Sequence, residues 1–174
     1  MTYDPYQDLP DAAEFTLSSE SLADGGTLAT PQLADDPSLG GANESPQLSW
    51  SGFPAATRSF AVTMYDPDAP TASGFWHWAA FNLPAAVTSL PAGAANTEGA
   101  LPAGTVTLKN DGGFAGFMGA APPAGHKIHR YMVVVHAVDV ERLDIPAGAT
   151  PAILGFNLFS HTLGRARITG LFGR

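Results

Sequence analysis

Short hydrophobic runs alternate with turn-forming residues along most of the chain. The strongest runs are rich in β-branched and aromatic residues and are bounded by Gly, Pro, Asn or Asp, which is typical of β-strands. These runs cover residues 59–65, 75–83, 105–109 and 131–140. Weaker strand-like segments cover residues 14–18 and 27–33, and a loop rich in Gly, Asp and Pro continues to residue 43. The pattern predicts a mainly all-β protein, closed as a sandwich or a barrel.

One helical pattern occurs near the C-terminus. The residues that share one face of this helix are Ile153, Leu154, Asn157, Leu158 and His161. Their spacing predicts a helix over residues 150–163, with Pro151 in its first turn and Gly164 at its end. The tail from Arg165 onwards alternates again, so we expect one last short strand.

The composition agrees with many short elements in one domain. The 174 residues include 19 Gly and 15 Pro, which suits strands joined by turns better than long helices. With 45% hydrophobic residues, the chain can close a substantial core. We find no linker and no internal repeat, and we expect one domain over residues 1–174 with a polar, loosely ordered arm at residues 1–12.

The charge of the chain limits its partners. A formal net charge of -8 provides no field to attract nucleic acid or an anionic membrane, so any phosphate must be recognised locally. The chain has no cysteine, which excludes disulfides, thiolate catalysis and Cys-ligated zinc. The start of the chain lacks the features of a secretory signal, and the longest apolar run, residues 131–138, is too short to cross a bilayer. We therefore expect a cytoplasmic protein without integral membrane association.

Two carboxylates follow the first strong strand, in the segment YDPDAP. Asp66 and Asp68 are two residues apart, so both side chains could point the same way. Pro67 pushes Asp66 into an extended conformation, which fixes its direction. The same residues would also form an ordinary Asp-Pro turn, so this motif alone does not decide between a site and a turn.

Two further strands bring histidines to the same region. In GFWHWAAFNLP, the period of two predicts Trp76 and Trp78 on one face, in the core, and His77 on the other. In GHKIHRYMVVVHAV, His129 and Tyr131 share one face at the start of a buried strand. Polar residues at the end of buried strands indicate a pocket.

A long Gly-rich segment, NDGGFAGFMGAAPPAG at residues 110–125, separates these strands. It is too long for a tight turn, so we expect a pocket-forming loop. It lacks the Gly-Lys-Ser/Thr ending of a nucleotide P-loop. Its backbone N–H groups could still bind an oxyanion.

Three other residues near these motifs have simpler interpretations. His126 lies in the Gly- and Pro-rich loop, where we expect it to be solvated. His136 alternates within an apolar strand and is expected in the core or an interface rather than at a ligand. Arg130 points away from His129, so we expect it to pair with an acidic residue of a neighbouring element.

Several motifs together resemble the phosphatidylethanolamine-binding proteins, also called Raf kinase inhibitor-like proteins. Six segments follow the order found in that family, from about residue 45 to the C-terminus: SPQLSW, YDPDAP, WHW, NDGG, GAAPPAG and HRY. The chain is most similar to the short bacterial branch. The resemblance implies a β-sandwich with Greek-key connections, one helix near the C-terminus, and a homodimer. Where vertebrate members have a glycine before the PP pair, this chain has Ala121, which narrows that wall of the pocket.

The resemblance also implies a ligand-binding site, which we assign motif by motif. Its residues are Asp66, Asp68, His77, Asp111, Pro123, His129 and Tyr131. We hypothesise that this pocket binds a small anionic or phosphorylated ligand through His77, His129 and Tyr131. Asp66 would then favour the charged form of a histidine and orient it. Alternatively, one of the two aspartates would meet the amine of a headgroup such as ethanolamine.

Other functions are weighed against this one. Two His and two Asp could ligate a divalent ion, but their spacing is not compact, so we expect no metal and no cofactor. No G-x-S-x-G segment and no other nucleophile in a matching context is present, so we expect a binding protein and not an enzyme. The main alternative is an inhibitor or modulator of a kinase or serine protease that acts through protein contact.

Overall fold

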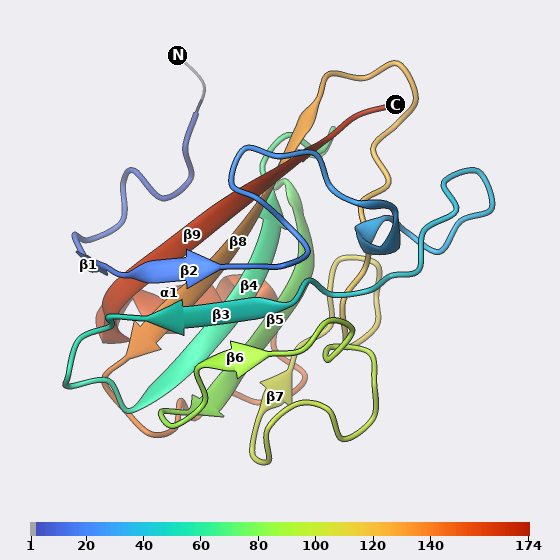
Figure 1. The fold of residues 1–174 in the computed structure, drawn as a ribbon. Coiled ribbons are helices and arrows are strands. Elements are labelled where there is room, and N and C mark those ends of the chain that lie inside the picture. The colour runs from blue at the N-terminus through green and yellow to red at the C-terminus, as the bar shows by residue number, and fades with distance from the viewer. Residues whose placement is uncertain (1–2) are drawn as a thin grey trace.

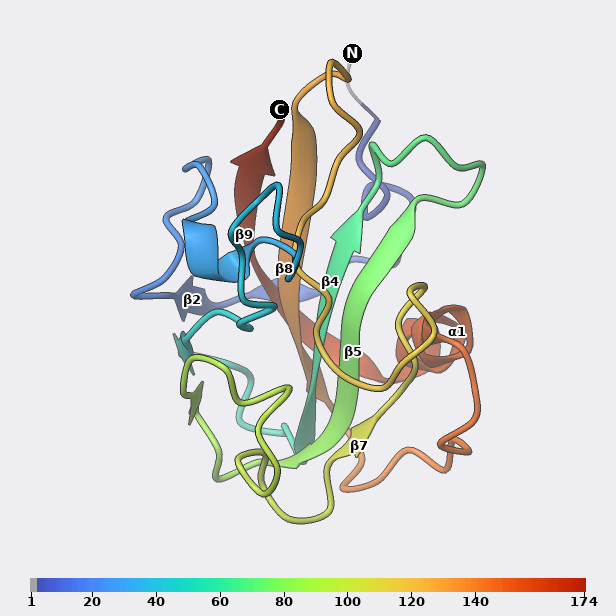
Figure 2. The ribbon, with the colours of Figure 1, turned by 90° about the vertical axis from the view of Figure 1, so that its right-hand side faces the viewer.

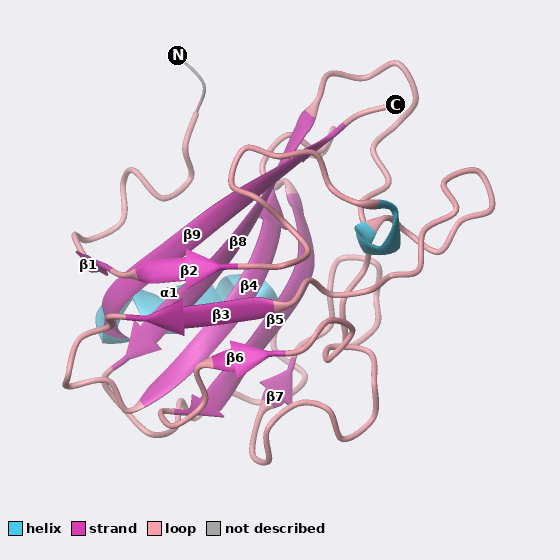
Figure 3. Ribbon diagram, in the orientation of Figure 1, coloured by secondary structure: helices cyan, strands magenta, loops and turns pink. Residues whose placement is uncertain are grey.

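Two β-sheets face each other, and the larger one contains the long strands. The computed structural model describes residues 3–174, so the first two residues of the predicted arm lie outside the described residues. The strand order of the large sheet is β1 (Ala13–Glu14), β9 (Thr162–Phe172), β8 (His129–Val138), β4 (Ser59–Asp66), β5 (Phe75–Pro84) and β7 (Val106–Thr107). The order of the small sheet is β2 (Thr16–Ser18), β3 (Leu48–Ser51) and β6 (Ser89–Leu90). Figure 1 shows the small sheet in front of the large one, and Figure 3 shows that strands and loops dominate.

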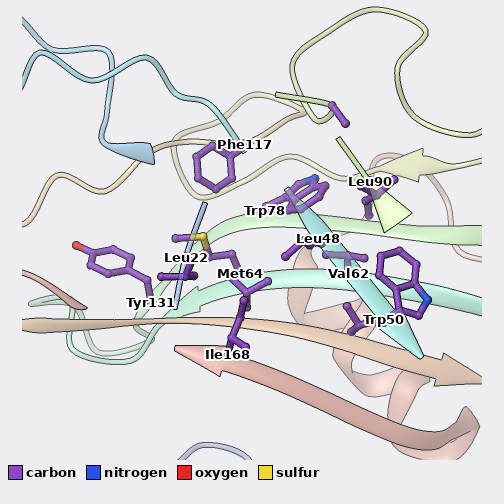
Figure 4. Close-up of a cluster of buried hydrophobic side chains, with 14 of the residues drawn as sticks. Leu22, Leu48, Trp50, Val62, Met64, Trp78, Leu90, Phe117, Tyr131 and Ile168 are labelled. Carbon is purple, nitrogen blue, oxygen red and sulfur yellow. The ribbon is translucent and has the colours of Figure 1, made fainter. Parts of the chain in front are cut away.

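The main core lies between the two sheets. Val62 and Met64 of β4 point into it because side chains of a strand alternate between its faces. Trp50 of β3 and Leu90 of β6 meet them from the small sheet. Figure 4 shows this cluster with Tyr131 at one end, where the hydroxyl group points away from the apolar side chains. The core thus holds Tyr131 by its ring and leaves its polar end available.

The other face of the large sheet is covered by the helix α1 (Pro151–His161). Leu154 and Leu158 of α1 belong to a second apolar cluster with Ala61 of β4 and Phe81 of β5. Figure 2 shows α1 on the side of the large sheet opposite the small sheet. The predicted fold class, mainly β with one helix near the C-terminus, is confirmed. Within residues 3–174 no helix is long and apolar enough to cross a membrane.

Most of the strong strand predictions are confirmed with small shifts. β4 and β5 agree with the predicted runs to within one residue, β8 begins two residues earlier, and β7 is shorter than expected. The prediction of a strand over residues 27–33 is wrong. Thr27 makes a single bridge to Leu171, and Thr30–Gln32 form a 3-10 helix, η1. Pro31 has a fixed φ and no N–H group, which suits the first turn of a helix better than a strand interior.

The C-terminal helix is confirmed, but its end and the following strand differ from the prediction. The Thr150 side chain caps α1 by accepting a hydrogen bond from the N–H of Ile153 at 3.4 Å. Gly164 does not end the helix. The helix ends at His161, and β9 starts at the next residue, Thr162, and continues for 11 residues, so Gly164 lies within the strand. A Cβ atom at position 164 would lie 2.9 Å from the carbonyl oxygen of Ala13. The close approach of β1 therefore explains this glycine.

Candidate binding site

A cavity of about 190 Å³ lies between the large sheet and the predicted pocket loop. Five of the predicted site residues line it: Asp66, His77, Pro123, His129 and Tyr131. Met118 and Gly119 of the loop and Phe75 of β5 complete much of its wall. The remaining two predicted residues, Asp68 and Asp111, do not line the cavity. The structure therefore brings together residues of β4, β5, β8 and the loop that are far apart in the sequence.

An irregularity in β5 turns His77 toward this cavity. Met64 pairs with Trp78 and Tyr65 pairs with Trp76, so His77 has no partner in β4 and β5 contains a β-bulge. Trp78 packs in the main core, whereas Trp76 lines a space on the opposite face of the sheet. The prediction that the two tryptophans share one face is wrong, because strict alternation assumes a regular strand.

Asp66 and His129 form a buried pair beside the cavity. His129 Nδ1 lies 2.6 Å from Asp66 Oδ2, and the two side chains are 1% and 3% exposed. The other carboxylate oxygen of Asp66 accepts a hydrogen bond from the backbone N–H of Asp68 at 2.8 Å. Both oxygens of Asp66 are thus used within the protein. Because a carboxylate accepts the bond, His129 carries a proton on Nδ1 and its ring is held in one orientation.

The second nitrogen of His129 contacts another histidine. His126 Nδ1 lies 2.7 Å from His129 Nε2, so one of the two imidazoles donates a hydrogen bond to the other. His126 is exposed, whereas His129 is buried. A chain of hydrogen bonds therefore runs from Asp66 through His129 to the surface. The expectation that His126 is only solvated is wrong, and its loop sequence contains no signal for this contact.

His77 presents one nitrogen to the cavity. Its Nδ1 donates to the carbonyl oxygen of Met118 at 2.7 Å, and its Nε2 makes no hydrogen bond with residues 3–174. Burial lowers the pKa of His77, and the hydrogen bond with Met118 and the charge of Asp66 offset this only in part. At neutral pH the imidazole is therefore neutral, and Nε2 is a hydrogen-bond acceptor.

Tyr131 lies between the two cavity histidines. Its ring centroid is 5.2 Å from that of His77 and 6.3 Å from that of His129. Burial raises the pKa of Tyr131, so the phenol keeps its proton over the physiological pH range. It can therefore donate a hydrogen bond to a ligand in the cavity.

Asp68 contacts basic residues outside the cavity. Its carboxylate lies 2.6 Å from Lys127 Nζ and 2.6 Å from Arg130 Nε. Burial alone would raise the pKa of Asp68, but the hydrogen bonds from Arg130 and Lys127 lower it to about 2. The prediction that Arg130 pairs with an acidic residue is confirmed. The partner of Arg130 is Asp68, which is one of the predicted ligand-binding residues. Its ion pairs with Arg130 and Lys127 indicate a structural role for Asp68.

Asp111 fastens the loop to β5. Its Oδ2 accepts a hydrogen bond from the backbone N–H of Trp76 at 2.8 Å. Its own N–H donates to the carbonyl oxygen of Trp76 at 3.0 Å. Asp111 therefore positions the strand that carries His77 but does not itself reach the cavity.

Three loop N–H groups next to the cavity are already used within the protein. Met118 donates to the carbonyl oxygen of His77 at 3.0 Å, and Gly119 donates to Asn43 Oδ1 at 2.8 Å. Ala120 donates to a carbonyl oxygen of η1 at 3.1 Å. These three groups fix the loop in place. They are therefore not free to bind an oxyanion.

No group of three or more His, Asp or Glu side chains within residues 3–174 is arranged to hold a metal ion. Of the four side chains of the metal hypothesis, Asp66, His77 and His129 line one cavity, whereas Asp68 does not. Asp66 binds His129, Asp68 binds basic residues, and His77 binds a backbone carbonyl.

Comparisons with known proteins agree on one family. A family model described as "Phosphatidylethanolamine-binding protein" matches residues 18–173. The chain is 46% identical to UPF0098 protein YbhB of Escherichia coli (strain K12), over 90% of this chain and 98% of YbhB. It is 36% identical to a UPF0098 protein of Methanothermobacter thermautotrophicus, over 91% of this chain and 98% of that protein.

A solved structure has the same fold. The crystal structure of E. coli YbcL, described as a new member of the mammalian PEBP family, matches with a TM-score of 0.88 and 43% sequence identity. The match covers 93% of this chain and 99% of the YbcL chain. The two sheets and the C-terminal helix are thus arranged as in that protein.

Proposed function

The chain belongs to the phosphatidylethanolamine-binding protein family, and from this premise we propose that its cavity binds a small phosphate-bearing group without reacting with it. The group could be a phosphomonoester or part of a lipid headgroup, since both offer terminal phosphate oxygens that accept hydrogen bonds. The observation that supports this most is the position of Tyr131 between His77 and His129. His77 and Tyr131 each have a polar atom that can share a proton with an oxyanion in this small cavity, and His129 forms part of its wall.

The charges beside the cavity are compatible with an anion. The carboxylate of Asp66 accepts hydrogen bonds at both of its oxygens, so neither needs to face the ligand. Tyr131 can donate one hydrogen bond. Nε2 of His77 has no proton at neutral pH, so a proton must lie between it and a phosphate oxygen when the ligand binds. Either His77 takes up this proton or the phosphate arrives as a monoanion.

The phosphate, and not an amine, is the recognised part in this proposal. An ammonium group needs a carboxylate or another acceptor with a free lone pair. Asp66 is the one carboxylate on the cavity wall, and it is already paired with His129. Asp68, the other aspartate of the amine hypothesis, binds Lys127 and Arg130. An ethanolamine substituent is therefore expected to add little affinity.

Binding without reaction is supported by the hydroxyl groups on the cavity wall. Thr71 donates its hydroxyl to the carbonyl oxygen of Gly74. The phenol of Tyr131 has a raised pKa, which makes it a poor nucleophile. Within residues 3–174 neither hydroxyl makes a hydrogen bond with an imidazole or a carboxylate that could activate it as an acceptor of phosphate.

Titrations followed by NMR test the proposal. Methyl phosphate and phosphoethanolamine are each added to the protein, and the imidazole signals of His77 and His129 are followed. Both ligands are expected to shift these signals with similar affinities, whereas ethanolamine is expected to have no effect. The variant Tyr131→Phe removes one donor and should weaken binding by about 10-fold.

A matched control separates the cavity from the rest of the surface. His161 pairs with Asp139 outside the cavity, so His161→Gln should leave phosphate binding unchanged. If neither phosphate compound shifts the signals of His77 or His129, the proposed function is wrong. Equal affinity for ethanolamine and methyl phosphate would contradict recognition through phosphate.

A further inference from the structure

A second cavity, of about 230 Å³, lies on the other face of the large sheet, between α1 and the N-terminal arm. The arm is held against β9 by an ion pair between Asp4 and Arg167 at 2.9 Å. Arg165 also donates a hydrogen bond to the carbonyl oxygen of Pro10 in the arm. This cavity is smaller than the roughly 300–1,000 Å³ of pockets for drug-sized ligands. Its size fits a small molecule.

Polar side chains of the sheet and the arm line this cavity. Thr63 Oγ1, Tyr6 Oη and Arg165 Nε are buried and make no hydrogen bond with residues 3–174. Burial raises the pKa of Tyr6, and the hydroxyl of Thr63 lowers it in part as a hydrogen-bond partner, so these two hydroxyls lie next to each other although their geometry is not that of a regular hydrogen bond. A buried polar atom without a partner is costly to folding. Of the three atoms, Arg165 Nε is the one without a hydrogen-bonding neighbour in residues 3–174, which indicates a donor available to a ligand.

Arg165 gives the cavity a positive charge. It takes part in no ion pair within residues 3–174, and no Asp or Glu side chain lines this cavity. His136 lies opposite Arg165 in the pairing of β8 with β9. Burial lowers the pKa of His136 to about 3, and the charge of Arg165 acts in the same direction. His136 is therefore neutral, and the guanidinium group is the charge that a ligand would meet.

The rest of the wall is apolar. Leu9 comes from the arm, Trp76 from β5, and Leu158 and Phe159 from α1. Phe159 is 58% exposed, so the cavity reaches the surface beside α1. A ligand can thus enter along the helix and place an apolar body against these side chains.

We propose that this second cavity binds a small amphipathic carboxylate, an aliphatic or aromatic acid of a few carbons. Its carboxylate would accept hydrogen bonds from Arg165 and from the one hydroxyl of the Thr63 and Tyr6 pair that does not donate to the other. Its hydrocarbon body would lie between Trp76 and Phe159. An amine would meet no acidic partner here, and one cation with apolar walls suits a monoanion better than a phosphate dianion. The site is separate from the phosphate-binding cavity.

Three ligands of equal length test the charge and the apolar body separately. Hexanoate, hexan-1-ol and hexylamine are titrated into the full-length protein by calorimetry. Hexanoate is expected to bind at one site, hexanol about 10-fold or more weakly, and hexylamine not measurably. Arg165→Gln should weaken hexanoate binding by a similar factor, and Thr63→Val should weaken hexanoate binding less.

One glycine allows the cavity to be filled. Gly155 of α1 lines it, and a Cβ atom at this position would meet nothing within 4 Å. Leucine is also a better helix former than glycine, so Gly155→Leu should fold and block the site. Phe156 of the same helix is 79% exposed and does not line the cavity, so Phe156→Ala tests whether hexanoate merely adheres to the apolar surface of α1.

The outcomes are distinct. Loss of hexanoate binding in Gly155→Leu but not in Phe156→Ala supports the proposal. The proposal fails if hexanoate and hexanol bind equally, if Gly155→Leu binds as well as the unchanged protein, or if no saturable binding is found and the cavity holds water only. Methyl phosphate binding should be the same in Gly155→Leu, so this test is independent of the first cavity.

Discussion

His129 Nδ1 donates a hydrogen bond of 2.6 Å to Asp66 Oδ2, and neither side chain is more than 3% exposed. Asp66 is the last residue of β4 and His129 is the first residue of β8, the neighbouring antiparallel strand, and the two are 63 positions apart in the sequence. The pair therefore depends on correct sheet pairing and in turn fixes one histidine of the phosphate-binding cavity.

Asp66→Asn tests the role of this pair. Asparagine keeps an acceptor for the N–H of Asp68 but removes the negative charge that orients His129. We expect a loss of about 1–3 kcal/mol of unfolding free energy, since a buried charged hydrogen bond is replaced by a neutral one. Urea unfolding measures this, and nitrogen NMR of the imidazole reports whether the proton leaves Nδ1. Unchanged stability together with an unchanged His129 tautomer would show that the pair has no such role.

The protein should take up protons when it binds phosphate. His77 is neutral at neutral pH because burial lowers its pKa, and a bound phosphate would raise that pKa by stabilising the charged imidazole. Affinity for methyl phosphate should therefore increase as the pH falls from about 8 to about 6. Calorimetry in two buffers with different ionisation enthalpies measures the uptake. In His77→Asn the uptake should decrease, and the same uptake in that variant would assign it to another group.

Asp68→Asn should change the acid stability of the protein. The carboxyl of Asp68 has a pKa of about 2 when folded, below its usual value of 3.8. Its contribution is complete above about pH 4 and is lost as the pH falls toward 2. Asp68→Asn should be less stable than the unchanged protein by about 1–3 kcal/mol at pH 7, and the difference should shrink below pH 4. A difference that is constant from pH 7 to pH 2 would contradict this role of the charge.

Gly119→Ala should displace the loop over the phosphate-binding cavity. A Cβ atom at position 119 would overlap the backbone of Leu33, which cannot move as a side-chain end could. We expect a loss of about 2 kcal/mol or more in unfolding free energy and weaker phosphate binding. Gly148→Ala is the control, because a Cβ atom there meets nothing within 4 Å. Equal thermal stability of the two variants would mean that the loop has more room than its contacts indicate.

The sequence predicted the elements whose signals are local. β4, β5 and β8 contain long runs of β-branched and aromatic residues, and α1 has a regular helical spacing. β3 and β6 were not predicted because four and two residues are too short to show a period. Residues 27–33 have strand-like composition, but Pro31 determines their conformation.

Only part of the site was predicted, because sequence motifs report local features and not the contacts between distant residues. Its motifs identify five of the residues on the cavity wall, but alternation alone cannot predict the contacts of Asp68, whose partner Lys127 is 59 positions away. The contact of His126 with His129 joins residues three positions apart and depends on the conformation of the irregular segment between them, whereas the cavity beneath α1 depends on tertiary packing. The homodimer, the cytoplasmic location and a kinase or protease partner stay predictions.

The β-bulge of β5 also has a consequence for the evolution of this strand. Residues before and after His77 follow two alternations that are out of phase by one position, so Trp76 and Trp78 face opposite sides. Because a one-residue slip exchanges the two faces of a strand, gain or loss of one residue between them would turn the side chains of one half of β5 from one cavity toward the other. Substitutions can therefore adjust the two cavities separately, whereas a single insertion or deletion at this point would disrupt both.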